Sequence, residues 1–181
     1  MLKQLTEQDA SFLNLETAET PEHVGGLHLI ELPEGYPGDF YEAYKATIRS
    51  RMHLVPFLHA KLAPVPLELD RPFWVEDDDV DLDYHVRREA VSKPGGMKQL
   101  EELVARLHSV ALDRTRPLWE FYVIDGLPAG PAIYTKIHHA AMDGASSQAL
   151  VCTMYDPTPA PRTFPAPAGD RPHEVADATH L

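Results

Sequence analysis

The clearest periodic pattern in the chain lies between residues 97 and 110. Apolar side chains recur there three or four positions apart, at Leu100, Leu103, Val104 and Leu107. Charged residues occupy most of the positions between them, as on the outer face of an amphipathic helix. The pattern therefore predicts a helix over residues 97–110 that buries one face.

Two further segments have features of helices. Apolar side chains recur at helical spacing after residue 39, at Phe40, Tyr44 and Ile48. Asp39 stands where an N-cap is expected, and Glu42 follows three residues later, as in a capping box. A last helix is expected over about residues 145–155, directly after Gly144.

The segments expected to be strands are short and rich in β-branched and aromatic residues. They cover residues 24–32, 73–75, 82–86, 119–124 and 131–137. The last two are separated by a Gly/Pro turn, so they are expected to pair as a hairpin. Residues 54–70 contain three prolines and are expected to form short extended pieces and turns.

The composition changes after Asp156. Six prolines lie between residues 157 and 172, separated mainly by small and polar residues. Such a segment cannot form a helix or a central strand, so an extended, semi-rigid connector is expected. The chain is long enough for one domain with a sizeable core. We therefore expect a domain over residues 1–156 and a linker over residues 157–181 that leads to a further part of the protein.

The composition also limits the partners. The formal net charge is −12, which argues against nucleic-acid binding and disfavours electrostatic attachment to an anionic membrane. Apolar docking on lipid stays open. No apolar run is long enough to cross a bilayer, and no signal peptide is visible. The single cysteine, Cys152, is expected to be buried and fits a reducing compartment, so the expected location is the cytoplasm.

The candidate chemistry lies at the end of the last predicted strand, in residues 138–144. Alternation along that strand would place His139 and His138 on opposite faces, if the strand continues that far. A near-neutral imidazole suits general-base catalysis on a hydroxyl group. Asp143 could orient a side chain or cap the following helix, and Gly144 permits backbone conformations that a side chain would block.

Spacing alone leaves other interpretations open. A histidine pair at a strand end is often structural. A zinc site formed by His138, His139 and Asp143 is disfavoured, because adjacent histidines on opposite faces chelate poorly and no Cys or His cluster is near in sequence. The acidic run at residues 76–79 lacks the glycine and distal glutamate of a calcium loop, so no metal is expected there either.

The segment HHAAMDG resembles the HHxxxDG motif of the coenzyme-A-dependent acyltransferase superfamily, which includes the condensation domains of peptide synthetases. Other segments resemble the bacterial wax ester synthase/diacylglycerol acyltransferase family in particular. They are LTEQDASFL at residues 5–13, HVGGL at 23–27, LDYHVRR at 82–88 and LDRTRPLWE at 112–120. The resemblance covers residues 1 to about 156 and identifies the chain as the N-terminal half of such an enzyme.

The resemblance implies an α/β (α+β) fold in which a mixed β-sheet is flanked by helices, one half of a two-domain architecture like that of chloramphenicol acetyltransferase. The active site of the family lies in a channel between the halves. Its implied reaction moves a fatty acyl group from acyl-coenzyme A to the hydroxyl of diacylglycerol or a long-chain alcohol. Acyl-coenzyme A is a co-substrate, and no permanently bound cofactor and no metal are implied.

The resemblance also implies residue roles. His139 is the general base, His138 supports it, and Asp143 maintains the architecture of the site. Gly144 lies close to the site, and the PLW block is structural, near the site or the interface between halves, at Pro117, Leu118 and Trp119. No acyl-enzyme intermediate is needed.

The implied partners are the C-terminal half, the two lipid substrates and, at most peripherally, a membrane or lipid droplet. Without the other half, the chain is expected to be inactive or nearly so. Two alternatives stay open: a condensation-type enzyme that uses carrier-bound thioesters, and a non-catalytic lipid-binding protein.

Overall fold

The computed structural model describes residues 2–142, 144–158 and 160–165 of the chain. Within these ranges the largest sheet has the strand order β2-β7-β6-β5. Its strands are β2 (His23–Leu29), β7 (Ala132–His138), β6 (Trp119–Asp125) and β5 (Val86–Ala90). The first three are antiparallel neighbours, whereas β5 runs parallel to β6. The sheet is therefore mixed, and the expected hairpin of β6 and β7 is confirmed.

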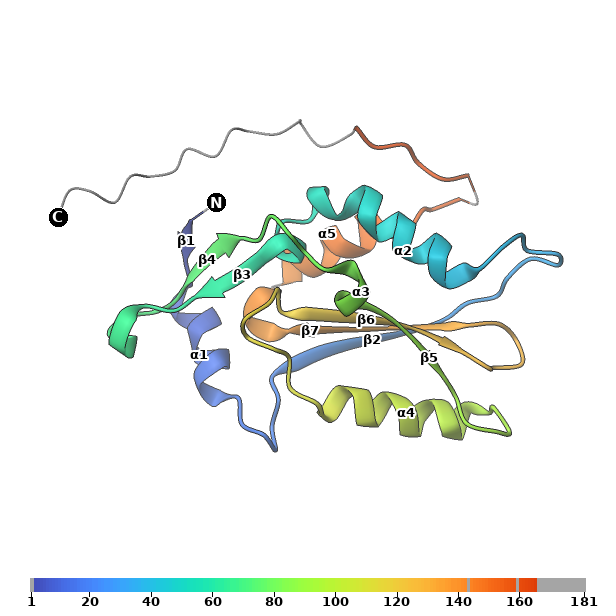
Figure 1. Ribbon diagram of the computed structural model, residues 1–181, viewed down its shortest axis with the longest axis horizontal. Coiled ribbons are helices and arrows are strands. Elements are labelled where there is room, and N and C mark those ends of the chain that lie inside the picture. Colours follow the sequence, from blue (N-terminus) through green and yellow to red (C-terminus); the bar gives the residue numbers. More distant parts are fainter. Residues whose placement is uncertain (1, 143, 159, 166–181) are drawn as a thin grey trace.

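Helices cover both faces of this sheet (Figure 1). They are α4 (Met97–Ser109) on one face, and α2 (Phe40–Arg51) and α5 (Gly144–Met154) on the other. Alternation along β6 supplies both cores: Tyr122 and Ile124 pack with α4, whereas Phe121 and Val123 pack with α2 and α5. Full burial of an apolar side chain of this size stabilises the fold by about 1.5–3 kcal/mol.

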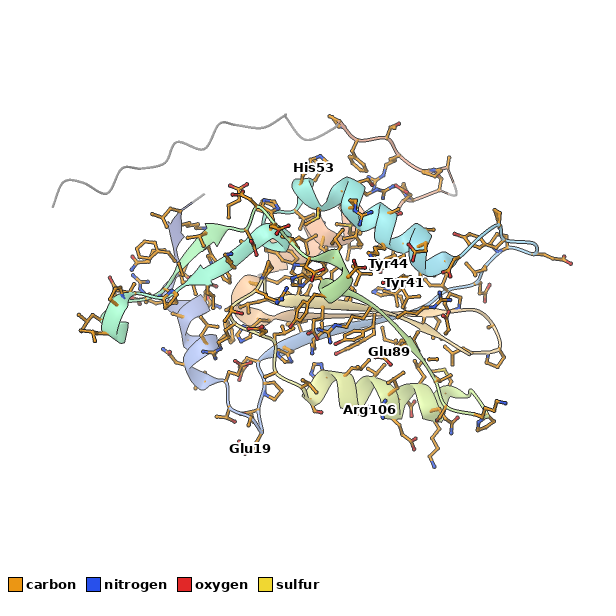
Figure 2. All side chains as sticks on the ribbon, in the orientation of Figure 1. Glu19, Tyr41, Tyr44, His53, Glu89 and Arg106 are labelled. Carbon is orange, nitrogen blue, oxygen red and sulfur yellow. The ribbon has the colours of Figure 1, made fainter. Side chains whose placement is uncertain are left out.

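The three predicted helices are confirmed: α4 and α5 end within one residue of their predicted bounds, and α2 begins directly after the predicted N-cap. Asp39 caps α2 by accepting a hydrogen bond from the backbone N–H of Tyr41 at 2.8 Å. Figure 2 shows Tyr41 and Tyr44 extending from α2 toward the sheet, and Tyr44 is buried. On α4, Leu100 is completely buried, whereas Arg106 lies on the outer, exposed face (Figure 2).

A smaller sheet with the strand order β1-β4-β3 lies near the C-terminal end of β7 (Figure 1). Its strands are β1 (Lys3–Gln4), β4 (Phe73–Glu76) and β3 (Ala60–Ala63). The proline-rich stretch forms β3 and short 3-10 turns around it, as its three prolines predict: η1 (Met52–Leu54), η2 (Pro56–His59) and η3 (Pro66–Glu68). Helix α1 (Glu7–Leu15) lies beside the same end of β7.

The strand predicted over residues 82–86 is wrong. Residues Leu82–His85 form one helical turn, α3, and strand β5 begins only at Val86. The side chain of Asp81 caps this turn by accepting from the N–H groups of Asp83 and Tyr84. In this arrangement Leu82 and Val86 are both buried, as they would be on one face of a strand. Their positions in the sequence therefore did not distinguish the two structures.

The expectation that Cys152 is buried is also wrong, because its side chain is exposed on α5. The buried face of this helix is formed instead by Leu150 and Met154, four residues apart. Strand β2 ends at Leu29, three residues before the predicted end at residue 32.

The first residues of the predicted linker lie against α2 and α5. Asp156 accepts hydrogen bonds from Arg51 and Arg162, each at 2.7 Å. Both guanidinium groups also lie 5.1 Å from the ring of Phe164. Residues 166–181 lie outside the described ranges, so the linker and the domain boundary stay predictions. Among the described residues, no helix is long and apolar enough to cross a membrane.

Candidate active site

The histidine pair lies where β7 changes into a 3-10 turn. His138 is the last residue of the strand, and His139 opens the turn η4 (His139–Ala141). The strand therefore does not continue through His139, and the turn, rather than strand alternation, sets the direction of its ring. The backbone N–H of His139 donates to the carbonyl of Glu22 at 2.8 Å, which ties the turn to the start of β2.

His138 is completely buried, and both its backbone N–H and its ring Nδ1 form hydrogen bonds with the backbone. Its N–H donates to the carbonyl of Leu118 at 3.0 Å, and its ring Nδ1 accepts from the N–H of Ala140 at 3.0 Å. Burial lowers the pKa of His138 to about 4, so the ring is neutral at pH 7. The ring bond to Ala140 caps the N-terminal end of the turn, and the N–H of Met142 closes the turn by donating to the carbonyl of His139 at 3.3 Å.

His139, in contrast, is exposed. Its imidazole stacks on the ring of Phe12 from α1, with centroids 4.1 Å apart and an interplanar angle of 15°. It also borders an open cavity of about 580 Å³ between β2 and α4, lined in addition by His23, Val24, Gly25, Leu27, Val104, His108 and Tyr134. An accessible imidazole fixed on one face and open to a cavity can exchange a proton with a bound hydroxyl group.

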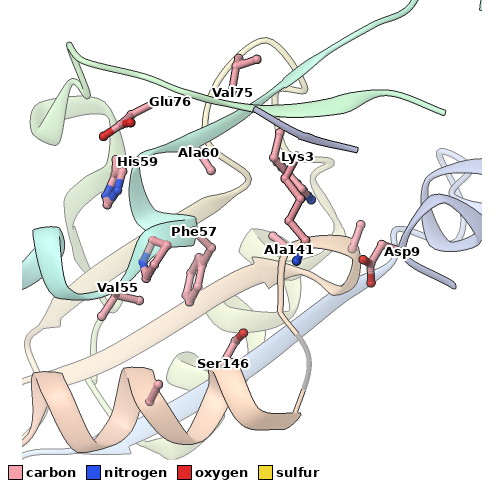
Figure 3. Close-up of a pocket in the computed structure, with 14 residues that line it drawn as sticks. Lys3, Asp9, Val55, Phe57, His59, Ala60, Val75, Glu76, Ala141 and Ser146 are labelled. Carbon is pink, nitrogen blue, oxygen red and sulfur yellow. The ribbon is translucent and has the colours of Figure 1, made fainter. Parts of the chain in front are cut away.

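A second cavity, of about 340 Å³, begins at the same turn (Figure 3). Ala140 and Ala141 form part of its wall. Its other apolar lining comes from the smaller sheet, the segment around η2 and α5, at Val55, Pro56, Phe57, Ala60, Trp74, Val75 and Ala149. Polar side chains also reach it, from Lys3, Asp9, His59, Glu76 and Ser146. The turn η4 thus lines two cavities: His139 borders the cavity beside β2, and Ala140 and Ala141 line the second one.

The PLW block lies directly behind the histidine pair. Pro117 is buried, and both Leu118 and Trp119 have no exposed surface. Leu118 holds His138 through its carbonyl and packs with Ala140 in one apolar cluster. The indole N–H of Trp119 donates to the carbonyl of Leu58 at 2.9 Å. These residues support the site from inside the core and do not line either cavity.

Sequence reasoning missed a cluster of polar side chains beside His138, in which Glu16 and His23 are buried and Arg114 reaches the surface. Oε1 of Glu16 lies 3.5 Å from Nε2 of His138 and 3.6 Å from Nε2 of His23. Oε2 of Glu16 accepts two hydrogen bonds from the guanidinium of Arg114, at 2.6 and 2.9 Å. His23 is directly opposite His138 in the pairing of β2 with β7. No local pattern predicts that pairing, because the two strands are far apart in the sequence.

Two of the predicted residues cannot be placed with the rest. Asp143 lies outside the described residues, and Gly144 is described only as the first residue of α5. In the part of the chain that the structure describes, no group of three or more His, Cys, Asp or Glu side chains could hold a metal ion.

The chain is similar to several larger proteins. A Mycobacterium tuberculosis protein named "Probable diacyglycerol O-acyltransferase tgs3" is 42% identical over 166 residues, which are 91% of this chain and 60% of the relative. Another from the same species, "Probable diacyglycerol O-acyltransferase tgs2", is 39% identical over 175 residues, covering 89% of this chain and 38% of the relative. The chain therefore spans less than two thirds of the length of these relatives.

Solved structures share the fold. The wax ester synthase/diacylglycerol acyltransferase from Marinobacter aquaeolei VT8 aligns with a TM-score of 0.70 and 38% identity, over 81% of this chain and 36% of that one. The starter condensation domain of the rhizomide synthetase RzmA aligns with a TM-score of 0.63 over 85% of this chain and 37% of that one. At 11% identity, this second likeness concerns the fold alone.

The catalytic-domain model of one family matches residues 5–180, almost the whole chain and further than the resemblance found in the sequence motifs. It is the model described as the wax ester synthase/diacylglycerol acyltransferase catalytic domain. Together with the 42% identity to the mycobacterial relative and the mixed sheet flanked by helices, this match shows that the chain belongs to the wax ester synthase/diacylglycerol acyltransferase family.

Proposed function

We propose that this chain forms part of an acyltransferase that moves a long-chain fatty acyl group from acyl-coenzyme A to the hydroxyl of diacylglycerol or a fatty alcohol. The observation that carries the proposal is the exposed His139 imidazole, which is fixed on Phe12 and borders an open cavity. The names of the relatives support the reaction class. Because those relatives are longer than this chain, the first proposed partner is the part of the enzyme that corresponds to the rest of their length.

His139 is the proposed general base. Its unprotonated ring nitrogen takes the proton of the acceptor hydroxyl as that oxygen attacks the thioester carbonyl. A carbon–oxygen bond forms, the carbon–sulfur bond breaks, and the thiolate of coenzyme A leaves with the proton that His139 returns. The acyl group passes directly between the substrates, so neither an acyl-enzyme nor a resident metal or cofactor takes part. His138 supports the base from the core, and Asp143 orients the turn.

The mainly apolar cavity in Figure 3 is the proposed place for a hydrocarbon tail of one substrate. Each buried methylene group contributes about 0.8 kcal/mol, so a long chain gains several kcal/mol from such a wall. Because Ala140 and Ala141 line this cavity, a tail lying in it ends close to His139. We propose that the reaction takes place in the cytoplasm, with peripheral contact to a membrane or lipid droplet that supplies the lipids.

Replacing His139 with Ala in a polypeptide that contains the whole enzyme tests the proposal. We expect kcat/KM for acyl transfer to fall by about 10²–10⁴-fold, because the attacking hydroxyl loses its base. His53→Ala is the matched control, since His53 is a partly exposed histidine in η1, directly after α2 (Figure 2), and lines neither cavity. Equal activity of the His139→Ala and wild-type proteins would contradict the proposal.

The same assay separates the two alternatives. A condensation-type enzyme would use an acyl group carried on a protein thioester and leave acyl-coenzyme A unused. A non-catalytic lipid-binding protein would bind lipid equally well with and without the His139 imidazole and would release no coenzyme A from either version.

A further inference from the structure

The cluster of Glu16, His23, His138 and Arg114 contains more buried polar atoms than its direct contacts satisfy. The side chain of Glu16 is only 7% exposed, and those of His23 and His138 are not exposed at all. Among the described residues, Oε1 of Glu16 and Nε2 of both histidines have no hydrogen-bond partner of normal length. A buried polar atom without a partner costs about 1–3 kcal/mol. These three atoms lie close together, so the position of the proton on each ring decides which of their contacts are favourable.

The other ring nitrogen of each histidine fixes where its proton lies. Nδ1 of His23 is 3.2 Å from the carbonyl of His108, which can only accept, so Nδ1 of His23 carries a proton. Nδ1 of His138 accepts from the N–H of Ala140, so in the neutral ring Nε2 of His138 carries the proton. Burial lowers the pKa of both rings. Neutral His138 therefore directs its Nε2–H at Oε1 of Glu16.

Only this form of His138 fits the turn that carries His139. In the opposite tautomer, or in the imidazolium, Nδ1 would carry a hydrogen and meet the N–H of Ala140 donor to donor. The cap of η4 would then be lost, and with it one of the contacts that hold the turn carrying His139. A carboxylate at position 16 opposes the opposite tautomer because it offers only acceptors to Nε2, whereas burial of the ring disfavours the imidazolium.

Arg114 determines which carboxylate oxygen of Glu16 faces the two histidines. The guanidinium holds Oε2 and also donates to the carbonyl of Leu13 at 2.6 Å, so it is anchored to α1. Oε1 is left for the histidines. The other charged or titratable groups near this pair are His108, Lys136 and His139, and Lys136 is paired with Glu120 at 2.7 Å.

We infer that Glu16, held by Arg114, is a positioning residue that fixes His138 as the Nε2–H tautomer and thereby holds the turn that presents His139. The role for His139 rests on the proposed function, whereas the tautomer of His138 does not. Glu16 touches no reacting atom in this scheme and acts through His138 alone.

Glu16→Gln is the sharpest variant, because it keeps the shape and replaces one oxygen with a donor. Arg114 has only donors, so the amide oxygen turns toward it and the amide NH₂ turns toward the histidines. His138 should then change to the Nδ1–H tautomer, because its Nε2 now faces a donor. Glu19→Gln in the loop after α1 is the matched control, since Glu19 is exposed (Figure 2).

The test is nitrogen NMR of the chain labelled in histidine, which reports the tautomer of each ring. In the wild type at pH 7 we expect His138 to be neutral and protonated at Nε2; an imidazolium or the Nδ1–H form would overturn the inference without any variant. In Glu16→Gln we expect the other tautomer and faster hydrogen exchange at the Ala140 amide. An unchanged tautomer in a folded Glu16→Gln protein would also overturn it.

Acyl transfer by the longer polypeptide links the tautomer to catalysis. We expect Glu16→Gln to lower kcat by about 10²-fold with little change in KM, because the base is misplaced while the cavities persist. Glu16→Asp retains the carboxylate and should keep the Nε2–H form and part of the activity. A switched tautomer with wild-type kcat would refute the link to His139. An inactive wild type with the expected tautomers would refute the proposed function and leave the arrangement of Glu16 and His138 standing.

Discussion

Lys136 is a charged residue in the centre of β7 with no exposed surface. Its ammonium group contacts Glu120 at 2.7 Å and donates to the carbonyls of Leu107 and Val110 at 3.1 and 3.0 Å. All three hydrogens of the ammonium group can therefore be used, as a buried charge requires. Because the two carbonyls lie at the C-terminal end of α4 and just beyond it, this single side chain fastens the helix to the sheet.

Replacing Lys136 with Met should lower the free energy of unfolding by about 3 kcal/mol. The change leaves Glu120 buried with fewer partners and removes the bonds to α4. Urea unfolding of the chain measures the loss. Lys98→Met is the control: it breaks an exposed pair with Glu102 at 3.9 Å and should cost less than about 1 kcal/mol. Similar losses in the two variants would contradict this account.

The sequence identified His138 and His139 because they form a contiguous motif next to a recognisable strand. Glu16 and Arg114 could not be found in the same way. Each has an ordinary local environment in the sequence, and their meeting depends on α1 and the segment before β6 folding over the end of β7. Phe12, which stacks on His139, was missed for the same reason.

At the scale of elements, the pattern of apolar residues predicted the helices and the β6–β7 hairpin well, because each buries one regular face. It failed at α3, where a single helical turn leaves no periodicity long enough to recognise. The order of strands in the sheet was also not predictable. The pairing of β2 with β7 joins strands that are far apart in the sequence, and the parallel pairing of β5 with β6 depends on how α4 crosses between them.

The segment that follows α5 should leave the domain surface in acid. Hydrogen bonds from Arg51 and Arg162 lower the pKa of Asp156 to about 2, below its ordinary value of 3.8. Because the folded-state pKa is depressed, this stabilisation is complete above about pH 5 and is lost as the pH falls through 3.8 toward 2. The fluorescence of a probe attached near Phe164 should therefore change in that range. An Asp156→Asn variant should already show the acid signal at pH 7.

At the scale of the molecule, the chain spans only part of the length of its relatives, and it exposes apolar side chains along β2. Leu27 and Leu29 are 40% and 59% exposed, and Leu27 also lines the cavity beside His139. We expect the isolated chain to show no acyl transfer above background and the longer polypeptide to be active. Coenzyme A release by the two proteins at equal concentration measures the difference. Activity of the isolated chain equal to that of the longer one would refute this expectation.

Helix α1 has a consequence for the site as a whole. It supplies the ring of Phe12, and the residue that caps its C-terminal end is Glu16. This nine-residue helix and its cap therefore contact the exposed imidazole of His139 and position the buried ring of His138, although neither histidine belongs to the helix. Any binding event or substitution that displaces α1 will therefore shift contacts of both His138 and His139, even when no residue of the HHAAMDG motif is replaced.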